Sequence, residues 1–142
     1  MKLFFTIFIS FTLSFTVFSQ GYSKKELRHK PANLIEAVEQ LKKIQNDSLK
    51  QKITSISERD FLSNSRALGI WIRNKWGLWK GKKLSKYFNA LGIFNPDDMS
   101  SIILTSYYRE LKGLDWRLDE QIQFYINDWN NQKKKAEVEI AP

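Results

Sequence analysis

Apolar residues recur at three- and four-residue spacing along most of this chain, which is the period of an α-helix with one buried face. No stretch of strand length alternates apolar with polar residues, and no internal repeat is visible. The pattern therefore predicts an all-α fold, a single compact bundle of about five or six short helices. The apolar stripes are Leu34, Ala37, Val38, Leu41 and Ile44; Leu49, Ile53 and Ile56; Leu68, Trp71, Ile72, Trp76 and Trp79; Leu84, Tyr87, Phe88 and Leu91; Met99, Ile102, Ile103 and Tyr107; and Ile122, Tyr125, Ile126 and Trp129.

Capping residues mark where several of these helices begin. Asn33 is followed three residues later by Glu36, the spacing of an N-cap and its reciprocal partner. The clearest start is the run from Asn95 to Asp98, Asn-Pro-Asp-Asp. There asparagine caps, proline takes the first helical position, and two acids complement the helix dipole. Ser57 and Asp60 indicate a further cap, which introduces Phe61 and Leu62.

The two ends of the chain differ from the helical middle. Lys2, an apolar run of about 16 residues and small residues at positions 17 and 19 predict a signal peptide over 1–19. The alternative is a membrane anchor, but a spanning helix needs roughly 18–20 apolar residues. We therefore expect a signal peptide at 1–19, a flexible leader at 20–32, a helical domain at 33–130 and a disordered tail at 131–142. The protein should be exported, periplasmic or extracellular, with no membrane span after cleavage.

Charge is unevenly distributed. The chain has 23 Lys and Arg against 15 Asp and Glu, a formal net charge of +8. Residues 61–96 contain seven basic residues and no acid, whereas residues 97–128 contain seven acidic and three basic residues. Part of the basic middle can thus pair with the acidic part inside the fold. The remaining charge predicts weak affinity for polyanions in general, without a specific nucleic-acid site.

Residue types argue against most catalytic chemistry. The chain has no cysteine, and its one histidine, His29, lies in the leader between two basic residues. Disulfides, cysteine nucleophiles and common zinc sites are therefore excluded, and we predict no cofactor and no metal. Asp97 and Asp98 are adjacent and point about 100° apart on a helix. Their helix-start role is favoured, and a carboxylate enzyme acting on envelope carbohydrate is the alternative.

Three tryptophans fall within the nine residues from Trp71 to Trp79. They share the stripe of Leu68, so we expect at least two of them in the core, with Trp79, beyond Gly77, partly exposed. The alternative is a binding surface whose aromatic rings stack on sugars, bases or peptide groups.

Two sets of residues are candidates for binding. The first is a surface groove of Arg73, Asn74, Trp79 and Asp98, although Arg73 and Asn74 could instead reach the caps and acids of the Asn95 helix. The second is a basic cluster of Lys80, Lys82, Lys83 and Lys86. That cluster is either a solvated turn and helix start or a contact for acidic envelope polymers or an acidic partner protein.

Several strings together resemble an uncharacterised bacterial domain-of-unknown-function family over roughly residues 31–130. They are Trp71-Ile72-Arg73-Asn74-Lys75-Trp76-Gly77-Leu78-Trp79, Pro96-Asp97-Asp98-Met99-Ser100 and the opening Asn33-Leu34-Ile35-Glu36-Ala37. In that family a histidine often precedes the Pro-Asp-Asp triplet, where this chain has Asn95. The resemblance implies one structural unit and carries no activity.

Residue types and resemblance together favour a non-catalytic binding or interaction module in the bacterial envelope. Its partner would be an unknown protein or an envelope polymer. The alternatives are the carboxylate enzyme and an inhibitory or structural partner domain.

Overall fold

The computed structural model describes residue 25 and residues 28–140, and the predicted signal peptide lies outside them. The described part contains helices and turns and no strand, which confirms the all-α class. In chain order the elements are α2 (Leu34–Ile44), α3 (Asp47–Thr54), α4 (Glu58–Asn64), α5 (Arg66–Lys75), the 3-10 helix η2 (Leu78–Lys80), α6 (Lys83–Ala90), α7 (Pro96–Leu111) and α8 (Leu118–Ile140). No helix in this part is both long and apolar enough to cross a membrane.

The described residues hold seven α-helices, one or two more than expected. The additional helix is α4, which the sequence pattern marks only as a cap followed by two apolar residues. The hydroxyl oxygen of Ser57 accepts the backbone N–H of Asp60 at 3.1 Å and its O–H donates to the Asp60 carboxylate at 2.7 Å. This cap satisfies the start of a helix too short to show apolar periodicity, and α4 then buries Phe61.

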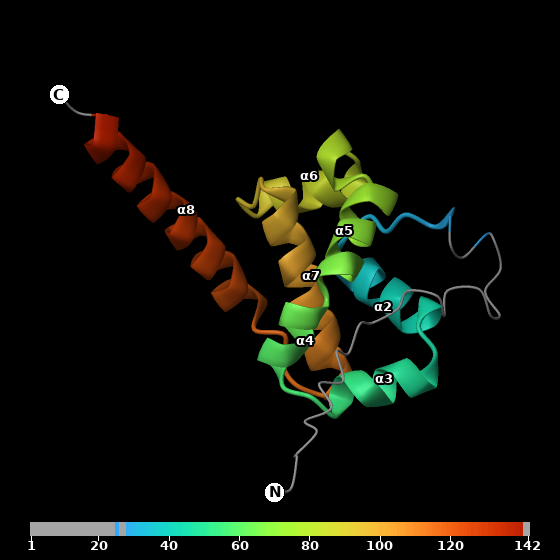
Figure 1. The fold of residues 1–142 in the computed structure, drawn as a ribbon. Coiled ribbons are helices and arrows are strands. Elements are labelled where there is room, and N and C mark those ends of the chain that lie inside the picture. Colours follow the sequence, from blue (N-terminus) through green and yellow to red (C-terminus); the bar gives the residue numbers. More distant parts are fainter. Residues whose placement is uncertain (1–24, 26–27, 141–142) are drawn as a thin grey trace, which may run out of the picture.

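α7 lies at the centre of the fold, and all the other elements, including η2, pack against it (Figure 1). It is buried around most of its circumference, since nine of its residues are shielded from solvent: Met99, Ser100, Ile102, Ile103, Leu104, Thr105, Ser106, Tyr107 and Tyr108. The predicted start is confirmed, because the Asn95 side chain accepts the N–H of Asp97 at 2.9 Å and Pro96 follows as the first helical residue. A helix enclosed in this way sets where every neighbouring helix can lie.

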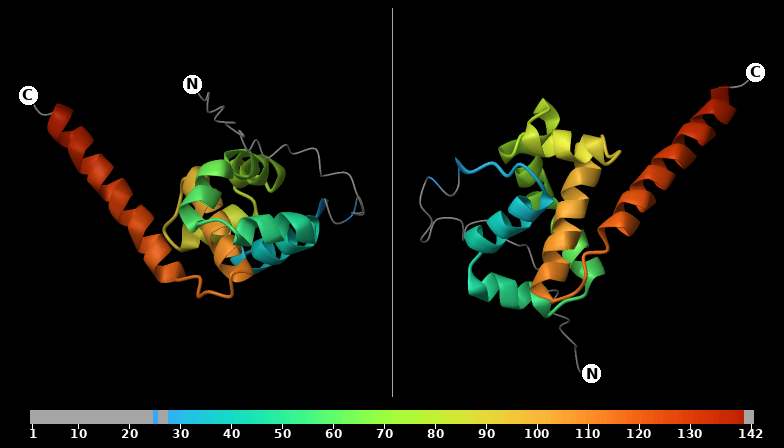
Figure 2. Two further views of the ribbon diagram at one scale, coloured as in Figure 1. Left: turned by 60° about the horizontal axis from the view of Figure 1, so that its bottom comes forward. Right: turned by 180° about the vertical axis from the view of Figure 1, so that it is seen from behind.

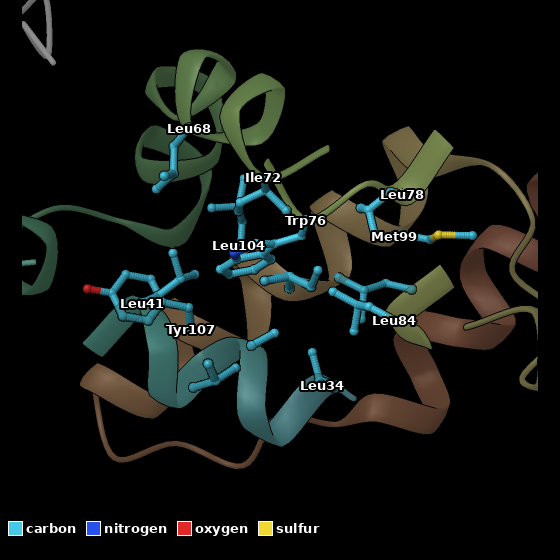
Figure 3. Close-up of a cluster of buried hydrophobic side chains, with 14 of the residues drawn as sticks. Leu34, Leu41, Leu68, Ile72, Trp76, Leu78, Leu84, Met99, Leu104 and Tyr107 are labelled. Atoms are coloured by element: carbon cyan, nitrogen blue, oxygen red, sulfur yellow. The ribbon is translucent and has the colours of Figure 1, made fainter. Parts of the chain in front are cut away.

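The tryptophan run divides between core and surface. Trp76 is 1% exposed and lies beside Ile72 and Leu104 in the buried cluster (Figure 3). Trp71 is half-buried and packs edge-on against Trp76, with ring centroids 5.7 Å apart. Trp79 is 59% exposed. Trp76 thus belongs to the core, Trp71 packs against it while partly exposed, and Trp79 lies outside, as expected.

α8 is attached to the domain only by its first half. Ile122 is buried, and Tyr125 and Ile126 are half-buried against the core. From Asn127 to Glu139 every side chain is exposed, and this half of the helix projects away from the body (Figures 1 and 2). The sequence predicts a disordered tail from residue 131, whereas the structure continues the helix to Ile140. Residues 131–140 contain no Gly or Pro, and seven of these ten residues are Lys, Glu, Gln or Ala. These residue types favour a helix even without packing.

Replacing Trp76 with Ala should lower the free energy of unfolding by about 3–5 kcal/mol, because it leaves a large cavity beside α7. Trp79→Ala is the matched control and should change that free energy by no more than about 0.5 kcal/mol, because its ring is largely in solvent. Urea denaturation followed by circular dichroism measures both values. Equal losses from the two substitutions would contradict the division into core and surface.

Candidate functional site

Trp79 lies on the surface, in a turn that directly follows buried residues. Trp76 is enclosed in the core and Leu78 is 3% exposed, so the chain is fixed immediately before Trp79. Gly77 and Gly81 flank η2 with φ values of 68° and 59°, in the left-handed region that favours glycine. A Cβ at Gly77 would also lie 3.2 Å from Cγ of Lys82. The two glycines therefore allow a tight turn that presents Trp79 outward.

Four lysines surround this turn and continue along α6. Lys80, Lys82, Lys83 and Lys86 are all exposed, and none forms a salt bridge with another described residue. α6 turns Leu84, Ser85 and Phe88 inward, which leaves the lysines on its outer side. We call Trp79 together with these four lysines the Trp79–lysine surface. It joins the predicted basic cluster to one member of the predicted groove.

Arg73 is engaged inside the fold. Its Nη1 forms an ion pair with Oδ1 of Asp97 at 2.9 Å and donates a hydrogen bond to Oγ of Ser100 at 2.9 Å, and its side chain is only 17% exposed. The contact ties the end of α5 to the first turn of α7. Gly69 makes room for it, since a Cβ there would lie 3.3 Å from Nη1. Of the two places considered for Arg73, the structure shows the one at the acids of the Asn95 helix.

Asp98 lies on the side of α7 that faces α8. It is half-buried, and burial raises its pKa above the ordinary value, with the negative charges of Asp97 and Asp128 adding to the effect. A raised carboxyl pKa occurs at active sites and at structural contacts alike. Here the neighbouring half of α8 is packed on the core through Ile126, which favours the structural explanation.

The four residues of the predicted groove therefore have different surroundings. Arg73 pairs with Asp97, Asp98 faces α8, Asn74 is exposed near the end of α5, and Trp79 is exposed on η2. Within the described chain no hydrogen bond or ion pair joins one of them to another. Their role as one binding site stays a prediction.

Other polar contacts between helices hold the fold together. Arg109 of α7 donates to both carboxylate oxygens of Glu58, at 2.8 and 2.9 Å, and to the backbone oxygen of Trp116 at 2.8 Å. The hydroxyl of Tyr107 donates to Oε1 of Gln45 at 2.6 Å. The described residues contain no group of three or more His, Asp or Glu side chains that could hold a metal ion. These contacts tie α7 to the start of α4, to the end of α2 and to the turn before α8.

Sequence patterns did not predict the exposure of three aromatic residues, Phe94, Phe124 and Trp129, and the placing of Trp129 in the buried stripe of the last helix was wrong, because that part of α8 projects beyond the core. Phe94 is 70% exposed in the loop before α7, whereas its neighbour Ile93 is buried. A hydrophobic residue directly before an N-cap often packs against the first turn of its helix, which would have predicted burial. In this loop Ile93 takes the inward position, and its N–H donates to the backbone oxygen of Phe88 at 3.0 Å. Phe94 is consequently left in solvent.

A family model described as a domain of unknown function, DUF6794, matches residues 30–111. That range is more than half of the 142-residue chain. The chain belongs to the DUF6794 family. The matched range ends with the last residue of α7, so the family region comprises α2 to α7 and leaves α8 outside. Neither the curated proteins nor the solved structures gave a match to this chain.

The DUF6794 description names no activity, so the exposed residues of the domain are the guide to its function. The Trp79–lysine surface and the Arg73–Asp97 contact both lie within the family region. The projecting half of α8 does not. We therefore look for the function of the family region on α5, η2 and α6.

The carboxyl of Asp98 should titrate above the ordinary aspartate value of 3.8, as followed by carboxyl ¹³C NMR. Folding raises this pKa, so the folded chain binds the proton more tightly than the unfolded chain. This group therefore lowers the free energy of unfolding as the pH rises from 3.8 through the folded pKa.

The variant Asp128→Asn should lower the pKa of Asp98, because it removes a neighbouring negative charge. Asp47→Asn, an exposed site on α3, is the control and should leave that pKa unchanged. A titration of Asp98 at or below 3.8 in the parent protein would contradict its placement under α8.

Proposed function

We propose that this DUF6794 domain is a non-catalytic binding module and that its Trp79–lysine surface recognises an acidic partner. One observation carries the proposal: a mostly exposed tryptophan on a tight turn stands among four exposed lysines, none of which forms a salt bridge with another described residue. Tryptophan is enriched among the residues that dominate binding energy at protein interfaces. Lysines that form no salt bridge within the described part of the chain keep their charge available for an acidic ligand.

Rigid presentation of Trp79 adds to this argument. A flexible aromatic side chain loses conformational freedom when it binds, and that loss weakens affinity. Here the burial of Trp76 and Leu78 and the two left-handed glycines fix the backbone before any partner arrives. The folding of the domain thus already orders the backbone that carries Trp79, which suits a binding role.

The proposed setting is the bacterial envelope, after export. It is supported by the predicted signal peptide at 1–19. An acidic envelope polymer or an acidic protein would then be the partner of the lysines. Binding to either should depend on salt, because the ligand's counterions are released when lysines replace them.

The alternative of a carboxylate enzyme finds little support in the geometry. A hydrolase of this kind would place two free carboxyls across a cleft beside an exposed aromatic ring. Asp97 is instead paired with Arg73, and Asp98 is half-buried on the side of α7 that faces α8. Neither carboxylate contacts Trp79 through a hydrogen bond within the described chain.

A structural or inhibitory partner domain, the other binding role, would use the exposed part of α8. Its projecting half is exposed on all sides, and Phe124, Trp129 and Val138 are exposed along the helix. These residues are scattered around the helix and do not form one stripe, so a structural or inhibitory partner domain ranks below the Trp79–lysine surface.

A variant with glutamine at all four lysines of the surface, 80, 82, 83 and 86, should bind the soluble polyanion polyphosphate roughly tenfold more weakly than the parent chain. Its binding should also depend less steeply on salt, since fewer counterions are released. Fluorescence anisotropy with labelled polyphosphate from about 50 to 200 mM salt measures both effects.

The charge-matched control replaces four other exposed lysines, Lys43, Lys133, Lys134 and Lys135, with glutamine. Both variants lose the same net charge, so a general charge effect would weaken them equally. We expect the control to bind nearly as well as the parent. An equal loss in both variants would exclude a defined site at η2 and α6.

A further inference from the structure

Two exposed aromatic residues lie beyond the two ends of α6. The helix crosses the end of the molecule that is opposite α3, with η2 before it and the loop of residues 91–95 after it (Figures 1 and 2). Trp79 belongs to η2 and Phe94 to the loop, and both are more than half exposed. An exposed aromatic residue therefore stands on each side of this short helix in the chain, with the lysines of the helix between them.

The helix between them presents lysines outward. α6 buries Leu84 and Phe88, and its outer side carries Lys83 and Lys86, with Lys82 at the N-cap. No acidic residue occurs anywhere between residues 61 and 96. We call Trp79, the four lysines and Phe94 the α6 ridge.

We infer that the α6 ridge binds the surface of an anionic lipid membrane, with Trp79 and Phe94 entering the interface and the lysines contacting the headgroups. The inference rests on the proposed function, since it names the acidic partner as lipid. Aromatic rings are favoured at the level of the headgroups, where one part of the ring is apolar and the other is hydrated. Basic residues beside them are drawn to the negative surface potential.

The composition of the ridge favours lipid over nucleic acid. Its cations are all lysines, whereas arginine, with its planar fork, is the residue that grips phosphate in two-point contacts. Single-stranded nucleic acids stack successive bases on aromatic rings along a groove. Trp79 precedes α6 and Phe94 follows it, and the eight residues of that helix span about 12 Å, which does not match the close spacing of stacked neighbouring bases. A membrane plane accepts aromatic rings at any such spacing.

The binding free energy expected from four lysines is sufficient for reversible attachment of the domain to an anionic membrane. Each lysine near an anionic membrane strengthens binding by about fivefold. The four lysines alone should give a few-hundredfold preference for anionic over neutral vesicles, before the aromatic rings contribute. High salt should reduce the preference, because charges at the surface are screened within about 10 Å at 0.1 M.

Vesicle co-sedimentation of the protein as isolated from its producing cells tests the inference. Vesicles of phosphatidylcholine with phosphatidylserine should bind it, and vesicles of phosphatidylcholine alone should bind it far more weakly. The double variant Trp79→Ala and Phe94→Ala should bind the anionic vesicles at least about tenfold more weakly. Ile35→Ala with Ile70→Ala, two exposed apolar residues on α2 and α5, is the matched control and should bind like the parent.

The other possible results distinguish the lipid inference from the proposed binding of an acidic partner. Binding of polyphosphate without binding of anionic vesicles would overturn the lipid inference and leave the proposed function standing. Tighter binding of a single-stranded oligonucleotide than of vesicles, lost in the Trp79 and Phe94 variant, would replace lipid by nucleic acid. Binding of none of the three probes by a folded chain would overturn both proposals. Equal loss in the Ile35 and Ile70 control would also overturn the role of the α6 ridge.

Discussion

The enclosure of α7 is the constraint on which the rest of this structure depends. A helix buried around most of its circumference must satisfy polar groups on sides that would normally face water. α7 does so locally and through its neighbours: Oγ of Ser100 donates to the backbone oxygen of Asp97, and the hydroxyl of Tyr108 donates to the backbone oxygen of Ile56. At its first turn Arg73 binds Asp97. With α7 held at its start and along its length, the surrounding helices have few alternative positions.

Local signals in the sequence predicted where helices begin. They predicted less well how deeply each helix is buried. The Asn-Pro-Asp-Asp start of α7 was predicted because a cap acts over three residues and needs no tertiary context. The enclosure of α7 was not predicted, because buried Thr105 and Ser106 look like a polar face in the sequence and are hidden only by neighbouring helices. The projecting half of α8 was missed for the opposite reason. Its residues have no apolar stripe, yet their intrinsic preference continues a helix that begins on the core.

The candidate site was predicted only in part, because neighbouring residues of the run from Trp71 to Trp79 have different roles. Some pack in the core, one pairs with α7, and one lies on the surface. The position of Trp79 after Gly77 placed it outside the core, and the four lysines were visible as a cluster. Whether Arg73 is exposed or paired with Asp97 depends on how the first turn of α7 lies relative to α5. The spacing of residues in the sequence does not reveal that arrangement. Phe94 follows Ile93 directly, and only the packed loop determines which of the two turns inward. The surface that results is simpler than the predicted groove: an anchored tryptophan, a row of lysines and a second aromatic residue across α6.

The central claim is that one short run of sequence supplies both the core of this DUF6794 domain and its binding surface. The side-chain N–H signals of the tryptophans in a ¹H–¹⁵N spectrum test it directly, during a titration with short-chain phosphatidylserine below its micelle concentration. We expect the indole signal of Trp79 to shift and to exchange rapidly with water, while that of Trp76 stays in place and exchanges slowly. Shifts confined to Trp129 on α8, or an indole of Trp76 that exchanges as fast as that of Trp79, would contradict the claim.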